Sequence, residues 1–177
     1  FHSSLRDYIY QVNTGSGIRG YANIDAHLYG GDISAEVRIL PAISLEAGLA
    51  GQRGRKDTFP ENNTDRDLGQ IAPVRSRVVL RFSPGASPPE EMRGLSGSIE
   101  WIRSGEARHI DSQAGEKQLQ GWDTLNFQAG YAWKSFTLNI GGDNLLDRHY
   151  AVVNSYEWDV IGGTGANPAI IYEPGRS

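Results

Sequence analysis

The sequence predicts an all-β protein, an antiparallel up-and-down meander of about seven strands. Apolar and polar residues alternate over segments of about 10 residues, which is the pattern of strands with one apolar face. Segments rich in Gly, Pro and Asn separate these runs, and the periodicity of an amphipathic helix is almost absent. Hydrophobic residues make up 38 % of the chain and 22 residues are glycine, so a thick core enclosed on both sides is not expected.

The first two strands show the alternation most clearly. Residues 2–12 form the first predicted strand, and a loop rich in Asn and Gly follows it. Residues 21–39 form the second, and its odd-numbered positions from His27 to Ile39 are mostly apolar. Its even-numbered face carries charged side chains, namely Asp32, Glu36 and Arg38.

The next three strands are predicted at residues 44–56, 75–82 and 94–107. Each has one apolar face, formed by Leu45, Ala47 and Leu49, by Val78, Leu80 and Phe82, and by Leu95, Gly97, Ile99 and Trp101. The connection at 84–93 contains three prolines, which lack the amide donor that a strand ladder needs. That connection is therefore not expected to be regular structure.

The last two strands, 123–133 and 136–140, form a tight hairpin because only two residues separate them. Aromatic side chains gather on its apolar face beside the turn, namely Tyr131, Trp133 and Phe136. Connections along the meander are of two kinds. The short ones, at 40–43 and 134–135, lie on one side, and the long ones lie on the other, at 57–69, 107–120 and 151–172.

These features favour a transmembrane barrel. Outer-membrane barrels have aromatic side chains at the ends of their strands, short turns on one side of the membrane and long loops on the other. Strands of about 9 to 11 residues cross a bilayer, but an odd number near seven does not close an ordinary barrel. The sequence therefore indicates a segment of a larger barrel. The alternative is a soluble all-β ligand-binding module, such as a sandwich or lipocalin-like barrel, whose polar face meets water.

Composition excludes several other classes of function. Without cysteine the chain has neither disulfides nor thiolate metal sites. A net charge of −4 without a basic block makes nucleic acid an unexpected partner. No apolar run of about 18 residues exists, so no transmembrane helix is expected. The chain opens on a strand-like run with no signal peptide, which indicates a piece of a longer protein.

Four segments resemble the barrel of TonB-dependent outer-membrane receptors. "FTLNIGGDNLLDRHYA" resembles the family strand that closes in N-L-(F/L)-D-x-x-Y, and "YEPGRS" resembles the E-P-G-R that opens the last strand. In the middle of the chain, "GYANIDAHLYGGDISAEVRI" and "LGQIAPVRSRVVLRF" also resemble family strands. Ala72 stands where the first proline of the last motif is usual.

The resemblance implies that residues 1–177 are the C-terminal part of a transmembrane barrel of about 22 strands. It also implies a set of partners: outer-membrane lipid, an N-terminal plug domain, TonB acting through that plug, and a metal or metal-chelate ligand. The plug, the TonB box and the closing strand are expected to lie outside this chain. The implied location is the outer membrane of a Gram-negative bacterium.

The implied function is energised uptake of a scarce metal or metal complex, of the siderophore or copper type, without enzyme activity. A passive outer-membrane channel or an outer-membrane enzyme is a further alternative. "YANIDAHLYGGD" together with "NPAIIYEPGR" most resembles the copper-receptor branch. Soft metals favour sulfur ligands, and the chain offers only Met92, on the short-turn side. Any such metal site is therefore expected elsewhere in the receptor.

The sequence predicts no catalytic residues, no metal site and no cofactor. The four histidines are far apart in sequence, at His2, His27, His109 and His149. "ENNTDRD" lacks the glycine and distal glutamate of a calcium loop, so it is expected to be a solvated surface loop. His149 and Ser155 have no orienting acid, and the glycine-rich "GGDNLL" and "GGTG" precede no helix.

Residues that bind ligand are left unidentified, although two regions are candidates. Charged mid-strand side chains are expected to line the lumen and contact the plug, namely Glu36, Glu46, Arg77 and Arg81. Ligand selection is expected in the three long loops, and Tyr156 and Trp158 give the last loop some aromatic surface. Residues 140–150 are expected to end a strand, with Asn144 and Asp147 satisfying backbone groups.

Overall fold

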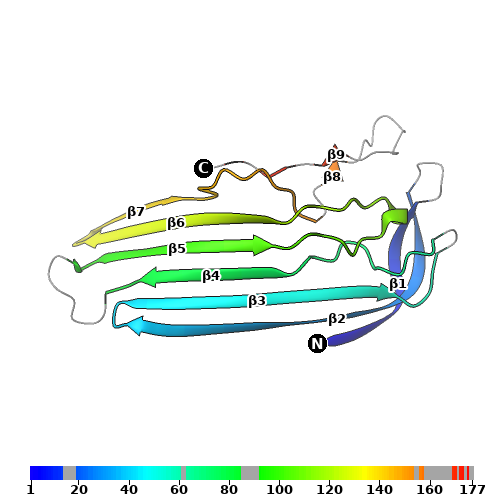
Figure 1. Ribbon diagram of the computed structural model, residues 1–177, viewed down its shortest axis with the longest axis horizontal. Coiled ribbons are helices and arrows are strands. Elements are labelled where there is room, and N and C mark those ends of the chain that lie inside the picture. The colour runs from blue at the N-terminus through cyan, green and yellow to red at the C-terminus, as the bar shows by residue number, and fades with distance from the viewer. Residues whose placement is uncertain are drawn as a thin grey trace.

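The computed structural model contains one antiparallel sheet of seven strands joined in chain order (Figure 1). It describes residues 1–13, 19–60, 63–84, 92–153, 156–157, 169–170, 172–173 and 175. The strands are β1 (His2–Asn13), β2 (Arg19–Leu40), β3 (Ile43–Lys56), β4 (Arg75–Phe82), β5 (Leu95–Ser104), β6 (Trp122–Trp133) and β7 (Phe136–Gly142). The predicted meander is therefore confirmed, with each strand where the alternation placed it.

Three short elements lie outside this sheet. A single 3₁₀ turn, η2 (Ser112–Ala114), interrupts the connection between β5 and β6. The two-residue strands β8 (Tyr156–Glu157) and β9 (Ala169–Ile170) pair with each other after β7. No helix among the described residues has the length and the hydropathy to cross a membrane.

The register aligns apolar side chains from strand to strand on one face of the sheet. Val37, Leu45, Leu80, Ile99 and Phe127 are successive cross-strand partners from β2 to β6. Direct partners point to the same face, so these side chains form one continuous row. Several members of the row are exposed to solvent within this chain. We call this surface the apolar face. It is the face expected to meet lipid.

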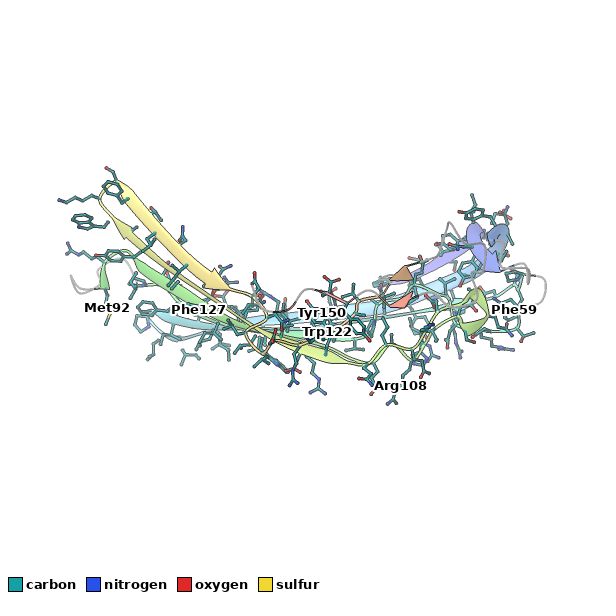
Figure 2. The ribbon with its side chains drawn as sticks, turned by 90° about the horizontal axis from the view of Figure 1, so that it is seen from above. Phe59, Met92, Arg108, Trp122, Phe127 and Tyr150 are labelled. Atoms are coloured by element: carbon teal, nitrogen blue, oxygen red, sulfur yellow. The ribbon has the colours of Figure 1, made fainter. Side chains whose placement is uncertain are left out.

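The opposite face, called the inner face below, is mainly polar. Its neighbouring row contains Glu36, Glu46, Val79, Glu100 and Asn126 as successive partners. Charged and amide side chains thus alternate with apolar ones along every central strand, as the period of two requires. The sheet as a whole is bent into an arc (Figure 2).

The two ends of the sheet carry connections of different length, as predicted. Tight turns at 41–42 and 134–135 lie at one end, and the connections at 57–74 and 105–121 lie at the other (Figure 1). At the short-turn end, Gly94 has a φ of +76°, and a Cβ there would lie 2.0 Å from the carbonyl oxygen of Ala132. Only glycine fits this entry to β5. Residues 85–91 of the proline-rich connection lie outside the described residues.

The buried core is small and lies at the long-loop end. One cluster joins β1, β2 and the connection after β3, and it consists of Tyr10, Ile24, Ala26 and Leu68. A second cluster joins the connection after β5 to the segment after β7, and it consists of Ala107, Leu119 and Ala151. The long connections therefore pack as ordered structure, while the sheet itself leaves its apolar face uncovered.

Candidate functional site

A ladder of ion pairs crosses three strands on the inner face. Arg77 on β4 places Nη1 2.7 Å from Glu46 Oε1 on β3 and Nε 2.5 Å from Glu100 Oε1 on β5. Arg81 Nη2 lies 2.9 Å from the second oxygen of Glu46. Both arginines predicted to line the lumen are therefore neutralised by carboxylates of neighbouring strands. The spacing follows from the register, because these side chains share one face and stand one or two residues apart.

The ladder continues into the turn that follows β7. Asn126 donates from Nδ2 to Glu100 Oε2 at 3.0 Å, and its Oδ1 accepts from the amide of Asn144 at 2.9 Å. Asn144 is buried, has a φ of +49°, and bonds both the N–H and the carbonyl of Arg148. The prediction that Asn144 satisfies backbone groups where the strand ends is confirmed. This polar segment is thus structural and part of the inner-face network.

Three charged residues of β2, Asp32, Glu36 and Arg38, stand on the same inner face without ion pairs to the described residues. Glu36 lies directly opposite Glu46, and Arg38 lies opposite Ser44. All three side chains are exposed. Because Glu46 is already shared by two arginines, Glu36 gains no local partner there. Asp32, Glu36 and Arg38 are therefore inner-face charges available to another part of the receptor.

At the long-loop end, a buried polar cluster surrounds Asp111. The side chains of Asp111 and Lys56 are paired and both are 0 % exposed. Tyr10 donates its hydroxyl to Asp111 Oδ2 at 2.8 Å, and Asn63 donates to the same oxygen at 2.9 Å. The other oxygen of Asp111 accepts from the amides of Gln113 and Ala114, capping η2. One carboxylate therefore joins β1, the end of β3 and both long connections.

Further contacts fasten the connection after β3 to the one after β5. Asp65 Oδ2 accepts from the amide and hydroxyl of Ser112, at 3.2 Å and 3.1 Å. Glu116 accepts from the amides of Asp111 and Gln70, each at 2.7 Å or less. Burial raises the pKa of Glu116 above its usual range. The two connections therefore form one unit, which we call the loop cap.

The loop cap corrects one prediction. "ENNTDRD" was expected to be a solvated surface loop, but Asn63 is buried and accepts a hydrogen bond from Lys56. Asp65 is engaged by Ser112 and by the amide of Asp67. Sequence alternation could not reveal this, because the partners are 48 residues apart for Asn63 and Asp111. Residues 61–62 lie outside the described residues.

The structure brings two of the four histidines together. The rings of His2 and His27 have centroids 6.0 Å apart on neighbouring strands, although the sequence separates them widely. His27 Nδ1 also lies 2.8 Å from Asp57 Oδ1, and His109 Nδ1 lies 3.5 Å from Asp67 Oδ2. Across the described parts of the chain, no three His, Asp or Glu residues are arranged as a metal site.

The remaining candidate residues are placed only in part. His149 is exposed, while Ser155 and Trp158 lie outside the described residues, so the pairing of His149 with Ser155 stays untested. Tyr156 is described through its backbone in β8. Met92 is exposed before β5, at the short-turn end.

The aromatic hairpin agrees with the prediction. Trp133 and Phe136 are cross-strand partners beside the tight turn, and both are exposed on the apolar face. Lys134 places Nζ 4.9 Å from the centre of the Trp133 ring. Amphipathic rings and snorkelling lysines of this kind are typical of the boundary between lipid and water.

Comparison with solved structures supports the fold. The chain is 24 % identical to the copper transporter OprC, with a TM-score of 0.79 over 98 % of this chain and 26 % of that one. It is 16 % identical to the ferric yersiniabactin uptake receptor FyuA from Yersinia pestis, with a TM-score of 0.71 over 99 % and 25 %. The FrpB iron transporter from Neisseria meningitidis matches with 14 % identity and a TM-score of 0.63 over 99 % and 26 %.

The chain thus spans about a quarter of the length of these transporters and receptors, and none of them is an enzyme. None of the curated protein sequences compared with the chain matches it. The sequence pattern of the family described as "TonB dependent receptor-like, beta-barrel" matches residues 1–145. Together with the seven-stranded meander, this match means that the chain belongs to the TonB-dependent receptor β-barrel family.

Proposed function

We propose that residues 1–177 are a C-terminal section of the barrel of an outer-membrane receptor that takes up a scarce metal or metal complex. The observation that carries this proposal is the pairing of an uncovered apolar face with an ion-paired inner face on one sheet. A water-soluble sandwich would bury that apolar face against a second sheet. In a bilayer, lipid covers the apolar face and the polar face lines the lumen.

The inner face also supports a plug domain as partner. Arg77 and Arg81 are neutralised within the wall, whereas Glu36 and Arg38 have no ion pair among the described residues. A plug seated against β2 would meet one acidic and one basic side chain two positions apart. TonB would act on this chain only through such a plug. In the proposed uptake, the force that TonB transmits to the plug opens a path for the ligand through the barrel.

The nature of the cargo follows from the ligand types the chain offers. The chain has no cysteine, and its one methionine lies at the short-turn end. Sulfur ligands for a bare soft metal would therefore have to come from outside this section. The relatives named above transport copper and ferric yersiniabactin, so both a metal ion and a metal chelate are consistent with the proposal. The donor set of this section favours the chelate.

The test uses the complete gene, expressed in a Gram-negative host that lacks its own metal receptors. Cells with and without TonB are given radiolabelled ferric chelates or copper, and accumulation is compared. Accumulation that needs both the receptor and TonB is the expected result. Accumulation without TonB would instead identify a passive channel. Recovery of the complete protein in the soluble fraction would identify a soluble binding module and refute the proposal.

A further inference from the structure

One group of side chains on the inner face has no role in the ladder or the loop cap. Arg75, Ser104 and Trp122 are successive cross-strand partners at the long-loop end of β4, β5 and β6. Tyr150, from the segment after β7, stacks on Trp122 with ring centroids 4.2 Å apart and an angle of 28° (Figure 2). The guanidinium carbon of Arg75 lies 5.3 Å from the centre of the Trp122 ring. A cation and two rings therefore meet at one point.

The cation of this group is available to a ligand. Arg75 is exposed and forms no ion pair with any of the described residues. This contrasts with Arg77, two residues along the same strand, whose guanidinium is held by Glu46 and Glu100. A guanidinium stacked on a ring keeps its N–H groups free in the plane, where they can bind a carboxylate with two parallel hydrogen bonds.

Tyr150 is held in place and kept neutral. Its carbonyl accepts from the amide of Glu173 at 2.7 Å. Burial, and then the carboxylate of Glu173, raise the pKa of the Tyr150 hydroxyl above its usual range. The hydroxyl is therefore a hydrogen-bond donor at all ordinary pH values, and the ring supplies an apolar surface beside Trp122.

A cavity of about 210 Å³ adjoins these side chains. Its wall is formed by Arg75 and Trp122 together with apolar residues, among them Pro73, Ala107, Leu119 and Ala151, and Tyr150 lies behind Trp122 outside this wall. For comparison, an apolar cavity of about 150 Å³ binds benzene. The space therefore suits a single substituted ring, which is smaller than a whole metal chelate.

We propose that this cavity binds an aromatic carboxylate, with the ring against Trp122 and the apolar wall and the carboxylate on Arg75, while Tyr150 holds Trp122 in place from outside the cavity. A cationic ring is disfavoured by Arg75. Phosphate would leave the apolar walls of the cavity without a partner. An uncharged apolar ring would leave the guanidinium of Arg75 unused. Only a flat anion of single-ring size uses every group present.

The inference rests on the proposed uptake function for its physiological meaning, because an aromatic carboxylate is a metal-binding arm of a chelate. Binding itself is tested separately from transport. The purified complete receptor, in detergent, is dialysed to equilibrium against radiolabelled salicylate, and in a second arm against ferric salicylate. The first arm measures the free aromatic acid and the second measures the acid as part of a chelate. Benzylamine, a cationic ring of similar size, serves as the ligand control.

Four variants of the receptor, one of them a control, locate the site. Arg75→Gln and Tyr150→Leu should each weaken salicylate binding by about tenfold or more, the first by loss of a charge-assisted bond and the second by loss of the ring that stacks on Trp122 and holds it in place. Tyr150→Phe keeps the ring and should retain most of the affinity. Arg103→Gln is the matched control, because Arg103 on β5 is exposed, has no ion pair among the residues that the structure describes, and points to the opposite face.

The expected result is binding of salicylate to the native receptor that depends on Arg75 and not on Arg103. The proposal is overturned if the complete receptor binds neither form of salicylate, which includes the case in which its own plug fills the cavity. Equal binding of benzylamine, or equal loss in the Arg103→Gln variant, also overturns it. If the receptor binds salicylate at this site but fails the TonB-dependent accumulation test, the binding site is supported and the proposed uptake function is refuted.

Discussion

The loop cap provides the sharpest test of the structure, because a single carboxylate joins four parts of the chain. Asp111→Asn keeps the shape of the side chain but removes its charge. Lys56 would then be a buried ammonium without a counter-ion, and its side chain is 0 % exposed. Breaking one partner of a buried ion pair costs about 3 to 5 kcal/mol. The NH₂ group of the new asparagine would also face groups that themselves donate hydrogen bonds, because every partner that the structure describes for the Asp111 carboxylate is a donor.

The effect is expected in the loop cap and not across the barrel. Hydrogen–deuterium exchange of the complete receptor measures it residue by residue. A loss of about 3 kcal/mol in local opening raises exchange of the amides in 64–70 and 111–116 by roughly 100-fold or more. Adding Lys56→Met to the Asp111→Asn variant removes the unpaired charge, so part of the lost protection should return.

Glu106→Gln is the matched control, because it breaks the pair between Glu106 and Arg108 in the same connection. Those side chains are 50 % and 71 % exposed, and exposed pairs contribute only about 0 to 1 kcal/mol. Arg108 lies on the convex side of the arc (Figure 2), and neither side chain of this pair contacts Asp111 or Lys56. The reasoning is refuted if Asp111→Asn leaves exchange within about threefold of the native receptor, since a 3 kcal/mol loss predicts far more. A matching effect from Glu106→Gln would refute it equally.

Three further predictions follow from other parts of the sheet. Leu80→Arg on the apolar face should destabilise the inserted barrel by about 2 to 4 kcal/mol in urea unfolding, whereas Gln128→Arg on the inner face should change it little. Gly94→Ala should strain the entry to β5, because its Cβ would lie 2.0 Å from a carbonyl oxygen. The loss of folded barrel would be measured as a smaller fraction of protein that runs at the folded position in gels of unheated samples. The raised pKa of Glu116 means that its contribution to loop-cap stability is present below its ordinary pKa and is lost as pH rises through the raised value. Glu116→Gln should remove this pH dependence of loop-cap stability, measured by hydrogen–deuterium exchange of the variant and the native receptor at the same series of pH values. The same pH dependence in both proteins would contradict the prediction.

The strands could be predicted from the sequence because their chemistry is local. Alternation placed β4 at residues 75–82 to the residue, and it separated the apolar face from the charged one along β2. The turn after β7 was predictable for the same reason, since Asn144 binds a residue only four positions away. Family resemblance then gave the architecture that alternation alone left open.

The loop cap and the aromatic cavity could not be predicted, because they depend on contacts between distant segments. Lys56 ends a polar run and gives no sign of burial, yet its partner is 55 residues further along. Tyr10 reads as an ordinary strand residue, but it meets Asp111 across 101 positions. Arg75 and Arg77 look alike in sequence, and only the structure shows that Arg77 is ion-paired while Arg75 has no ion pair among the described residues.

The unequal strand lengths mean that neighbouring parts of this wall are held together in different ways. β2 has 22 residues and β4 has 8, although their middles lie in the same sheet. Past the row that contains Ala50 and Arg75, β2 continues through residues 19–31, which is roughly 40 Å of strand at about 3.3 Å per residue. Above β4 to β6 the same height is filled by the connections at 63–74 and 105–121 instead of by strand, and they reach β1 and the end of β3 (Figure 1). That part of the wall is therefore held by side-chain contacts such as those of Asp111, where the neighbouring part is held by a backbone ladder.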